Sequence, residues 1–133
     1  MDLLAPGGEV SSVAVGAGGC FFTPGIISAL SADAVGQETA CFVEGQYQLM
    51  SGTSQAAPHV AGLSALVLQV AGSLGAELGT RRAFAVKGIL RAACTRLPGL
   101  RRTEQGQGLP SWDNIEMILR DIASGSRRVT DFL

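Results

Sequence analysis

The chain has 133 residues, of which 47% are hydrophobic and 16% are charged, and its net charge is −1. This composition excludes a disordered or collagen-like protein and supplies enough apolar side chains for one globular domain. The charges are unevenly placed, because residues 1–80 contain six acids and no lysine or arginine, whereas residues 81–133 contain ten basic residues and five acids. The arginines fall on predicted helix faces without interleaved aromatic residues. We therefore expect a solvated or internally paired surface and no nucleic-acid partner.

The first half of the chain predicts short extended segments and one long helix. Asp2–Ala5 is predicted to be a short strand that ends at a Pro-Gly-Gly turn, Ile26–Leu30 a second strand, and Tyr47–Met50 an extended segment. Ser31–Val43 has the composition of a loop. Ala56–Gly72 is apolar on every face, which predicts a helix buried between layers. The apolar run Val60–Gly72 is only about a dozen residues long and includes Ser64 and Gln69, whereas a membrane span needs about 20, so we expect no membrane.

The second half predicts two amphipathic helices. Thr80 is a candidate N-cap for the first helix, whose apolar stripe is expected to run as far as Leu97, before Pro98-Gly99 ends it. Ser111 is the candidate cap of the last helix, which has isoleucine and leucine on one face. The members of the two stripes are Val86, Ile89, Leu90, Ala93 and Leu97, and then Ile115, Ile118, Leu119 and Ile122. Residues 125–133 are expected to fray.

The most specific segment is Gly52-Thr53-Ser54-Gln55-Ala56-Ala57-Pro58-His59-Val60-Ala61-Gly62. A polar turn with a hydroxyl at its corner opens directly into an apolar helix. The unpaired N–H groups of the first helical turn and the positive end of the helix dipole then face the reacting oxygen beside Ser54. The segment resembles the active-site serine motif of the subtilisin-like serine proteases (subtilases). The flanking segments Asp2–Gly8 and Gly106–Leu109 are similar to the strand and the glycine turn of the same family.

This resemblance implies a fold and a chemistry. The fold would be an α/β three-layer sandwich around a mostly parallel sheet, with residues 1–124 as the C-terminal portion of the catalytic domain and 125–133 as a tail. The activity would be that of a serine endopeptidase. Ser54 would be the nucleophile that forms an acyl-enzyme with a protein or peptide substrate, and its backbone N–H would be one oxyanion donor. The resemblance calls for no cofactor and favours an extracellular location; some relatives hold structural calcium.

The chain departs from the family pattern in ways that limit this expectation. Its only histidine is His59, and it has no asparagine before Asn114, so the triad histidine, the triad aspartate and the side-chain oxyanion donor are expected upstream. We therefore expect a fragment that needs the upstream part of the domain and is inactive alone. The alternative is a non-catalytic subtilase-like binding module or a decayed gene fragment. A small membrane or structural helical protein is a third interpretation, based only on the apolar helix.

His59 is predicted to be structural. Five helical residues turn the chain by about 500°, which places its side chain about 140° from that of Ser54 and on a different side of the helix. The family motif agrees, since this histidine is not the catalytic one. The three cysteines allow either a Cys20–Cys41 disulfide or three buried thiols, and no Cys/His spacing resembles a metal site.

Overall fold

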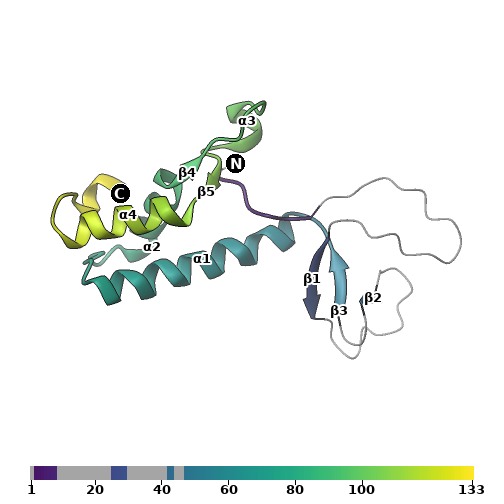
Figure 1. Ribbon diagram of the computed structural model, residues 1–133, viewed down its shortest axis with the longest axis horizontal. Coiled ribbons are helices and arrows are strands. Elements are labelled where there is room, and N and C mark those ends of the chain that lie inside the picture. Colours follow the sequence, from purple (N-terminus) through teal and green to yellow (C-terminus); the bar gives the residue numbers. More distant parts are fainter. Residues whose placement is uncertain (1, 9–24, 30–41, 44–46) are drawn as a thin grey trace, which may run out of the picture. The chain divides into compact units, whose positions relative to one another are not determined.

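The computed structural model describes residues 2–8, 25–29, 42–43 and 47–133 (Figure 1). The chain divides into two compact units, one formed by Pro6–His59 and the other by Met1–Ala5 together with Val60–Leu133. The long helix α1, Thr53–Leu74, begins in the smaller unit and contributes its remaining residues to the larger one.

The smaller unit contains a three-stranded antiparallel sheet. Its strands are β1 (Ile26–Ala29), β2 (Phe42–Val43) and β3 (Tyr47–Met50), in the order β1-β3-β2. Ile26 lies opposite Met50 and Ala29 opposite Tyr47. The strand and the extended segment predicted within residues 26–50 are confirmed over their described residues, and Leu30, the predicted last residue of the first strand, lies outside the described residues. Strand β2 lies in a segment predicted to be a loop, and two residues are too few for a period to be detected.

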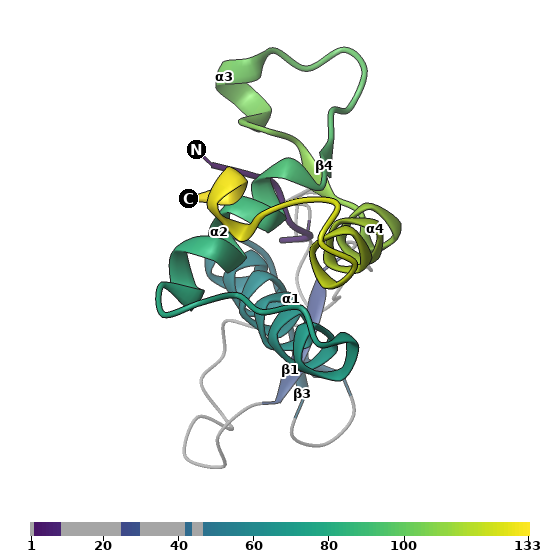
Figure 2. The same cartoon turned by 90° about the vertical axis from the view of Figure 1, so that its left-hand side faces the viewer.

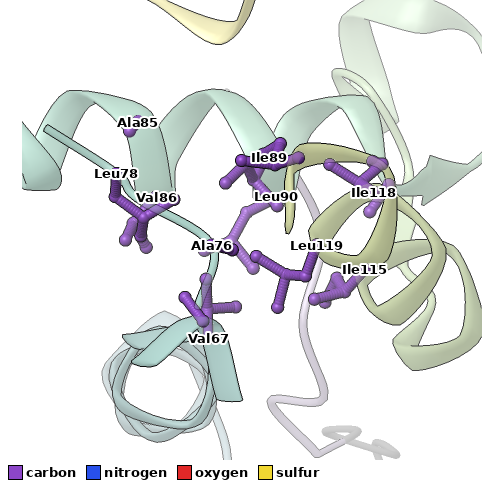
Figure 3. Packing of buried hydrophobic residues seen from close by; sticks show 13 residues of the cluster. Val67, Ala76, Leu78, Ala85, Val86, Ile89, Leu90, Ile115, Ile118 and Leu119 are labelled. Atoms are coloured by element: carbon purple, nitrogen blue, oxygen red, sulfur yellow. The ribbon is translucent and has the colours of Figure 1, made fainter. Parts of the chain in front are cut away.

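The larger unit packs α2 (Arg82–Ala92) and α4 (Trp112–Ala123) against the second half of α1. In Figure 3, Ile89 and Leu90 of α2 and Ile115 and Leu119 of α4 point toward one another above Val67 of α1. The buried apolar side chains of this cluster are Val67, Ala71, Ala76, Leu78, Ala85, Val86, Ile89, Leu90, Ala93, Ile115, Ile118, Leu119 and Ile122. All four residues of the stripe predicted for the last helix are among them, so this prediction is confirmed.

Helix α2 is shorter than the stripe predicts. It begins after Arg81, with no side-chain cap, so the predicted cap at Thr80 is wrong. It ends at Ala92, and the chain continues into β4 (Cys94–Thr95), which pairs antiparallel with β5 (Leu109–Pro110). Leu97, expected in the buried stripe, is 39% exposed. The helical spacing of apolar residues continues in the sequence beyond Ala92, where the backbone changes from helix to strand. The spacing of apolar residues alone does not show where that change occurs.

The segment Asp2–Ala5 is extended but forms no strand of a sheet in the described structure. It pairs with the glycine turn instead, since the Leu4 N–H donates to the Gly108 carbonyl at 2.8 Å and the Gln107 N–H donates to the Asp2 carbonyl at 3.0 Å. Gly108 has a φ of 110°, and a Cβ there would lie 2.7 Å from the carbonyl carbon of Thr95. A side chain at position 108 is therefore excluded, because the glycine turn lies against both Asp2–Ala5 and Thr95.

Helix α1 has the predicted position but not the predicted burial. Only Val67 and Ala71 are buried, and Leu66 and Leu68 are 48% and 44% exposed. By length and composition alone the helix could cross a membrane, a test that the core helix of a soluble protein also passes. The prediction of a helix buried on every face is thus wrong for this chain, because within the described residues few elements cover it.

The last residues form a short element. Residues 125–133 are predicted to fray, whereas the structure has a 3-10 helix, η2, at Val129–Phe132. Val129 and Phe132 are partly buried against the core cluster. Two apolar side chains three residues apart suffice to anchor a single turn, although they are too few to form a detectable periodic pattern.

The fold is thus a mixture of helices and small antiparallel sheets. Both sheets in the described residues are antiparallel. The mostly parallel sheet of a three-layer α/β sandwich is not seen within residues 2–8, 25–29, 42–43 and 47–133.

Candidate active site

The turn before α1 depends on a close approach of two glycines. The Gly52 N–H donates to the Gly7 carbonyl at 2.7 Å, and a Cβ at Gly7 would lie 2.7 Å from the Gly52 carbonyl oxygen. Gly52 has a φ of 142°, which side-chain-bearing residues rarely adopt. The Pro-Gly-Gly turn at residues 6–8 therefore supports the serine turn directly. Sequence inspection missed this role, because nothing in the sequence shows that these two distant turns are in contact.

Ser54 is the second residue of α1. The N–H groups of Gln55 and Ala56 both return to the Gly52 carbonyl, at 3.1 and 3.2 Å. Within the part of the chain that the structure describes, the N–H groups of Thr53 and Ser54 donate to no backbone carbonyl. These two donors are the unsatisfied groups expected at a helix start, and the positive end of the helix dipole adds to their attraction for a negative oxygen.

Pro58 lies inside the first two turns of α1. A proline has no N–H, so the intrahelical hydrogen bond from residue 58 to the Ser54 carbonyl is missing. The helix nevertheless runs without a break from Thr53 to Leu74, so its backbone accommodates the proline. The weakened first turn leaves the backbone around Ser54 with fewer constraints than the turns that follow it.

Ser54 and His59 line one hollow of about 370 Å³ in the smaller unit. Its other lining residues are Ile26, Ile27 and Ser28 of β1, with Gln55 and Pro58 of α1. At about 100° per residue, this set covers an arc of about 140° of the helix, with Ser54 and His59 at its two ends. The sequence predicts that these two side chains lie on different sides of the helix, whereas the hollow is wide enough to include both. The contribution of β1 had no signal in the sequence.

His59 already has a hydrogen-bond partner. Its Nδ1 lies 2.9 Å from the Gln55 carbonyl, an acceptor, so the proton is on Nδ1 in this arrangement. The predicted hydrogen bond is therefore present, whereas the predicted packing is not, since the side chain is exposed. No hydrogen bond joins it to Ser54 in the described structure, and residues 6–8, 25–29, 42–43 and 47–59 include no carboxylate that could orient it. A histidine base needs both interactions.

The remaining candidate groups lie elsewhere. Cys94 is a free thiol whose pKa is raised by burial and whose Sγ–H donates to the Leu90 carbonyl at 3.1 Å. Cys20 and Cys41, the predicted disulfide partners, lie outside the described residues. Across those described, no group of three His, Cys, Asp or Glu side chains is arranged to hold a metal ion.

A serine on a glycine turn at a helix start, beside two N–H groups that donate to no described backbone carbonyl, has the geometry that a nucleophile with an oxyanion donor would need. The profile of a protein family described as the Subtilase family (peptidase S8) matches residues 1–108. The match includes both glycine turns and all of α1, and it ends before α4. No curated protein and no solved structure matches the chain. The chain belongs to the subtilase family of peptidases.

Proposed function

We propose that Ser54 is the nucleophile of a subtilisin-like serine endopeptidase and that this chain is the C-terminal portion of its catalytic domain. The observation that carries the proposal is the pair of N–H groups at Thr53 and Ser54, which donate to no described backbone carbonyl, at the start of the helix that holds the hydroxyl. The family match adds the class of reaction. The substrate is a protein or peptide, and the chemistry needs no cofactor.

In this mechanism the Ser54 Oγ attacks the carbonyl carbon of the scissile bond while a base takes its proton. The carbonyl oxygen becomes an oxyanion, and the Ser54 N–H donates to it. Collapse of the tetrahedral intermediate returns the proton to the leaving amine and leaves an acyl-enzyme on Ser54. Water, deprotonated by the same base, then releases the acid.

The base, its orienting carboxylate and the second oxyanion donor come from sequence upstream of this chain. His59 is a poor base here, because no hydrogen bond joins it to Ser54 in the described structure and no described carboxylate of its unit can orient it. The exposed faces of α1 give independent support, since a helix with few buried residues needs further layers to cover it. A three-layer sandwich with a mostly parallel sheet would supply them.

Active-site labelling tests the proposal. A protein extended upstream through the missing segments is treated with a fluorophosphonate, and the adduct is mapped by peptide mass spectrometry. We expect labelling at Ser54, and none in Ser54→Ala. Ser51 and Ser64 are internal controls, because Ser51 precedes the turn and the Ser64 hydroxyl donates to the Val60 carbonyl at 2.7 Å. An adduct on either of them, or none anywhere, refutes the assignment.

A second candidate, a non-catalytic subtilase-like module, is favoured by the absence of a second histidine from the chain. Activity of the chain by itself separates the cases. We expect no turnover of casein by the 133 residues alone, because removal of the nucleophile or the base from a related protease costs about 10⁶ in kcat, a value taken from that relative. Restored turnover on upstream extension supports the endopeptidase. A folded, extended protein that binds peptides without cleaving them supports the module.

A further inference from the structure

The segment between β4 and β5 carries exposed apolar side chains that the proposed catalytic role does not use. Figure 2 shows this segment, with the short helix α3 (Arg102–Gln105), projecting away from α2 and α4. Leu97 and Leu100 lie on it and are 39% and 44% exposed. Pro98 and Gly99 lie between them, and Gly99 has a φ of 82°, as expected at the third position of a tight turn with proline before it.

A buried glutamine holds this turn in one conformation. Gln105 is the buried polar side chain of the described residues, 2% exposed. Its Oε1 accepts from the Leu97 N–H at 2.8 Å, and its Nε2 donates to the carbonyls of Leu97 and Leu100 at 3.2 and 2.6 Å. The Gln105 side chain thus holds the backbone of both leucines in place, so this turn would lose little conformational entropy on binding.

Arginines flank the two leucines. Arg101 forms an ion pair with Glu104 at 3.0 Å, which raises the pKa of the arginine and lowers that of the glutamate through their hydrogen bond. Arg96 and Arg102 are exposed and form no ion pair with any residue that the structure describes. The projecting tip therefore combines two apolar side chains with two uncompensated positive charges.

We propose that the turn Arg96–Arg102 docks on an anionic lipid surface, with Leu97 and Leu100 entering the interface and Arg96 and Arg102 at the headgroups. The projecting shape favours this occupant, because apolar side chains at a tip can enter the boundary of a bilayer. The positive charge selects anionic headgroups. No membrane was expected from the sequence, since α1 was interpreted as a core helix; this contact is at the surface and does not involve a spanning helix.

A tryptophan probe tests the position of the tip. In a Trp112→Phe background, Leu100→Trp reports on the turn and Leu133→Trp reports on the exposed C-terminal residue, 57% exposed. The full chain, cleared by centrifugation, is mixed with vesicles of phosphatidylcholine and phosphatidylserine that contain brominated acyl chains. We expect quenching of the tryptophan at 100 and not of the one at 133. Equal quenching at both positions overturns the proposal, because adsorption would then not involve the turn specifically.

Flotation of the native chain with the same vesicles provides an independent measurement. Arg96→Gln combined with Arg102→Gln is expected to weaken vesicle binding about thirty-fold, since each arginine near an anionic surface contributes about a factor of five. The matched control is Arg81→Gln with Arg82→Gln, which also removes two exposed arginines from the larger unit. The proposal is overturned if both double variants lose vesicle binding equally, or if the native chain binds pure phosphatidylcholine vesicles as strongly as those with phosphatidylserine. Failure to bind vesicles, with capture by a poly-glutamate peptide that only the first pair abolishes, would assign the turn to an acidic protein instead.

Discussion

Replacement of Gly88 by alanine tests the packing of the larger unit. In an ordinary helix interior this change stabilises the fold by about 1 kcal/mol. Gly88 lies in α2 where the chain end crosses it, and a Cβ there would overlap the Phe132 carbonyl oxygen and lie 2.7 Å from its carbonyl carbon. Because backbone and not a flexible side chain is in the way, η2 must move.

The magnitude follows from what η2 buries. Full burial of a large apolar side chain contributes about 1.5–3 kcal/mol. Val129 and Phe132 are only partly buried against the core, so displacing both costs about 2 kcal/mol. After the helix-propensity gain of about 1 kcal/mol, Gly88→Ala should destabilise the chain by about 1 kcal/mol, or lower Tm by about 4–8 °C.

Thermal unfolding followed by circular dichroism at the helix band measures this shift. The control is a chain that ends at residue 128, in which nothing blocks the new methyl group. There Gly88→Ala should raise Tm, so the sign of the effect reverses between the two backgrounds. A rise in Tm in the full chain would refute the reasoning and show that η2 does not lie on α2 at this position.

Three further outcomes are expected. Gly7→Ala in an upstream-extended protein should slow fluorophosphonate labelling by about 100-fold, because the new methyl group would displace the serine turn. Gly62→Ala is the matched control, since a Cβ there meets nothing within 4 Å, and equal labelling rates in the two variants would contradict the close contact between Gly7 and Gly52. The pKa of Asp2 is lowered by its hydrogen bond and ion pair with Lys87, 2.8 Å away. Its contribution to stability is therefore present above the ordinary aspartate pKa and lost as pH falls through the lowered value, so the Tm difference between wild type and Asp2→Asn should vanish at pH values below that lowered pKa. His59→Ala in the extended protein should change kcat less than about tenfold while reducing stability through loss of one exposed hydrogen bond; a loss of several orders of magnitude in kcat at unchanged Tm would make it the base.

The sequence predicted local features well wherever one element determines them. The four apolar residues of α4 recur at helical spacing and are all buried, so that pattern sufficed. Leu97 continued a similar spacing in α2 but lies beyond the helix end, where β4 pairs with a strand 15 residues later. The position of α1 was predictable from its composition. Its burial was not, because burial depends on the elements that lie against a helix.

In the candidate site too, the features formed by neighbouring residues were predictable, whereas those formed by residues distant in the chain were not. The serine, its turn and its helix start are contiguous, so one motif predicts all three. The hydrogen bond between Gly52 and Gly7 and the wall formed by Ile26–Ser28 come from residues distant in the chain. No local pattern contains such pairings. His59 falls between these cases, since helical geometry predicted its direction relative to Ser54 but not that one hollow is lined by both residues.

The register between β1 and β3 determines which β1 residues lie beside Ser54. Met50, at the end of β3, is fixed opposite Ile26, and Ile26 also forms part of the wall beside Ser54. A shift of one residue in this pairing would move that wall by about 3.3 Å along the strand. A substitution in β1 that leaves every catalytic group intact could therefore change which side chain a substrate meets there.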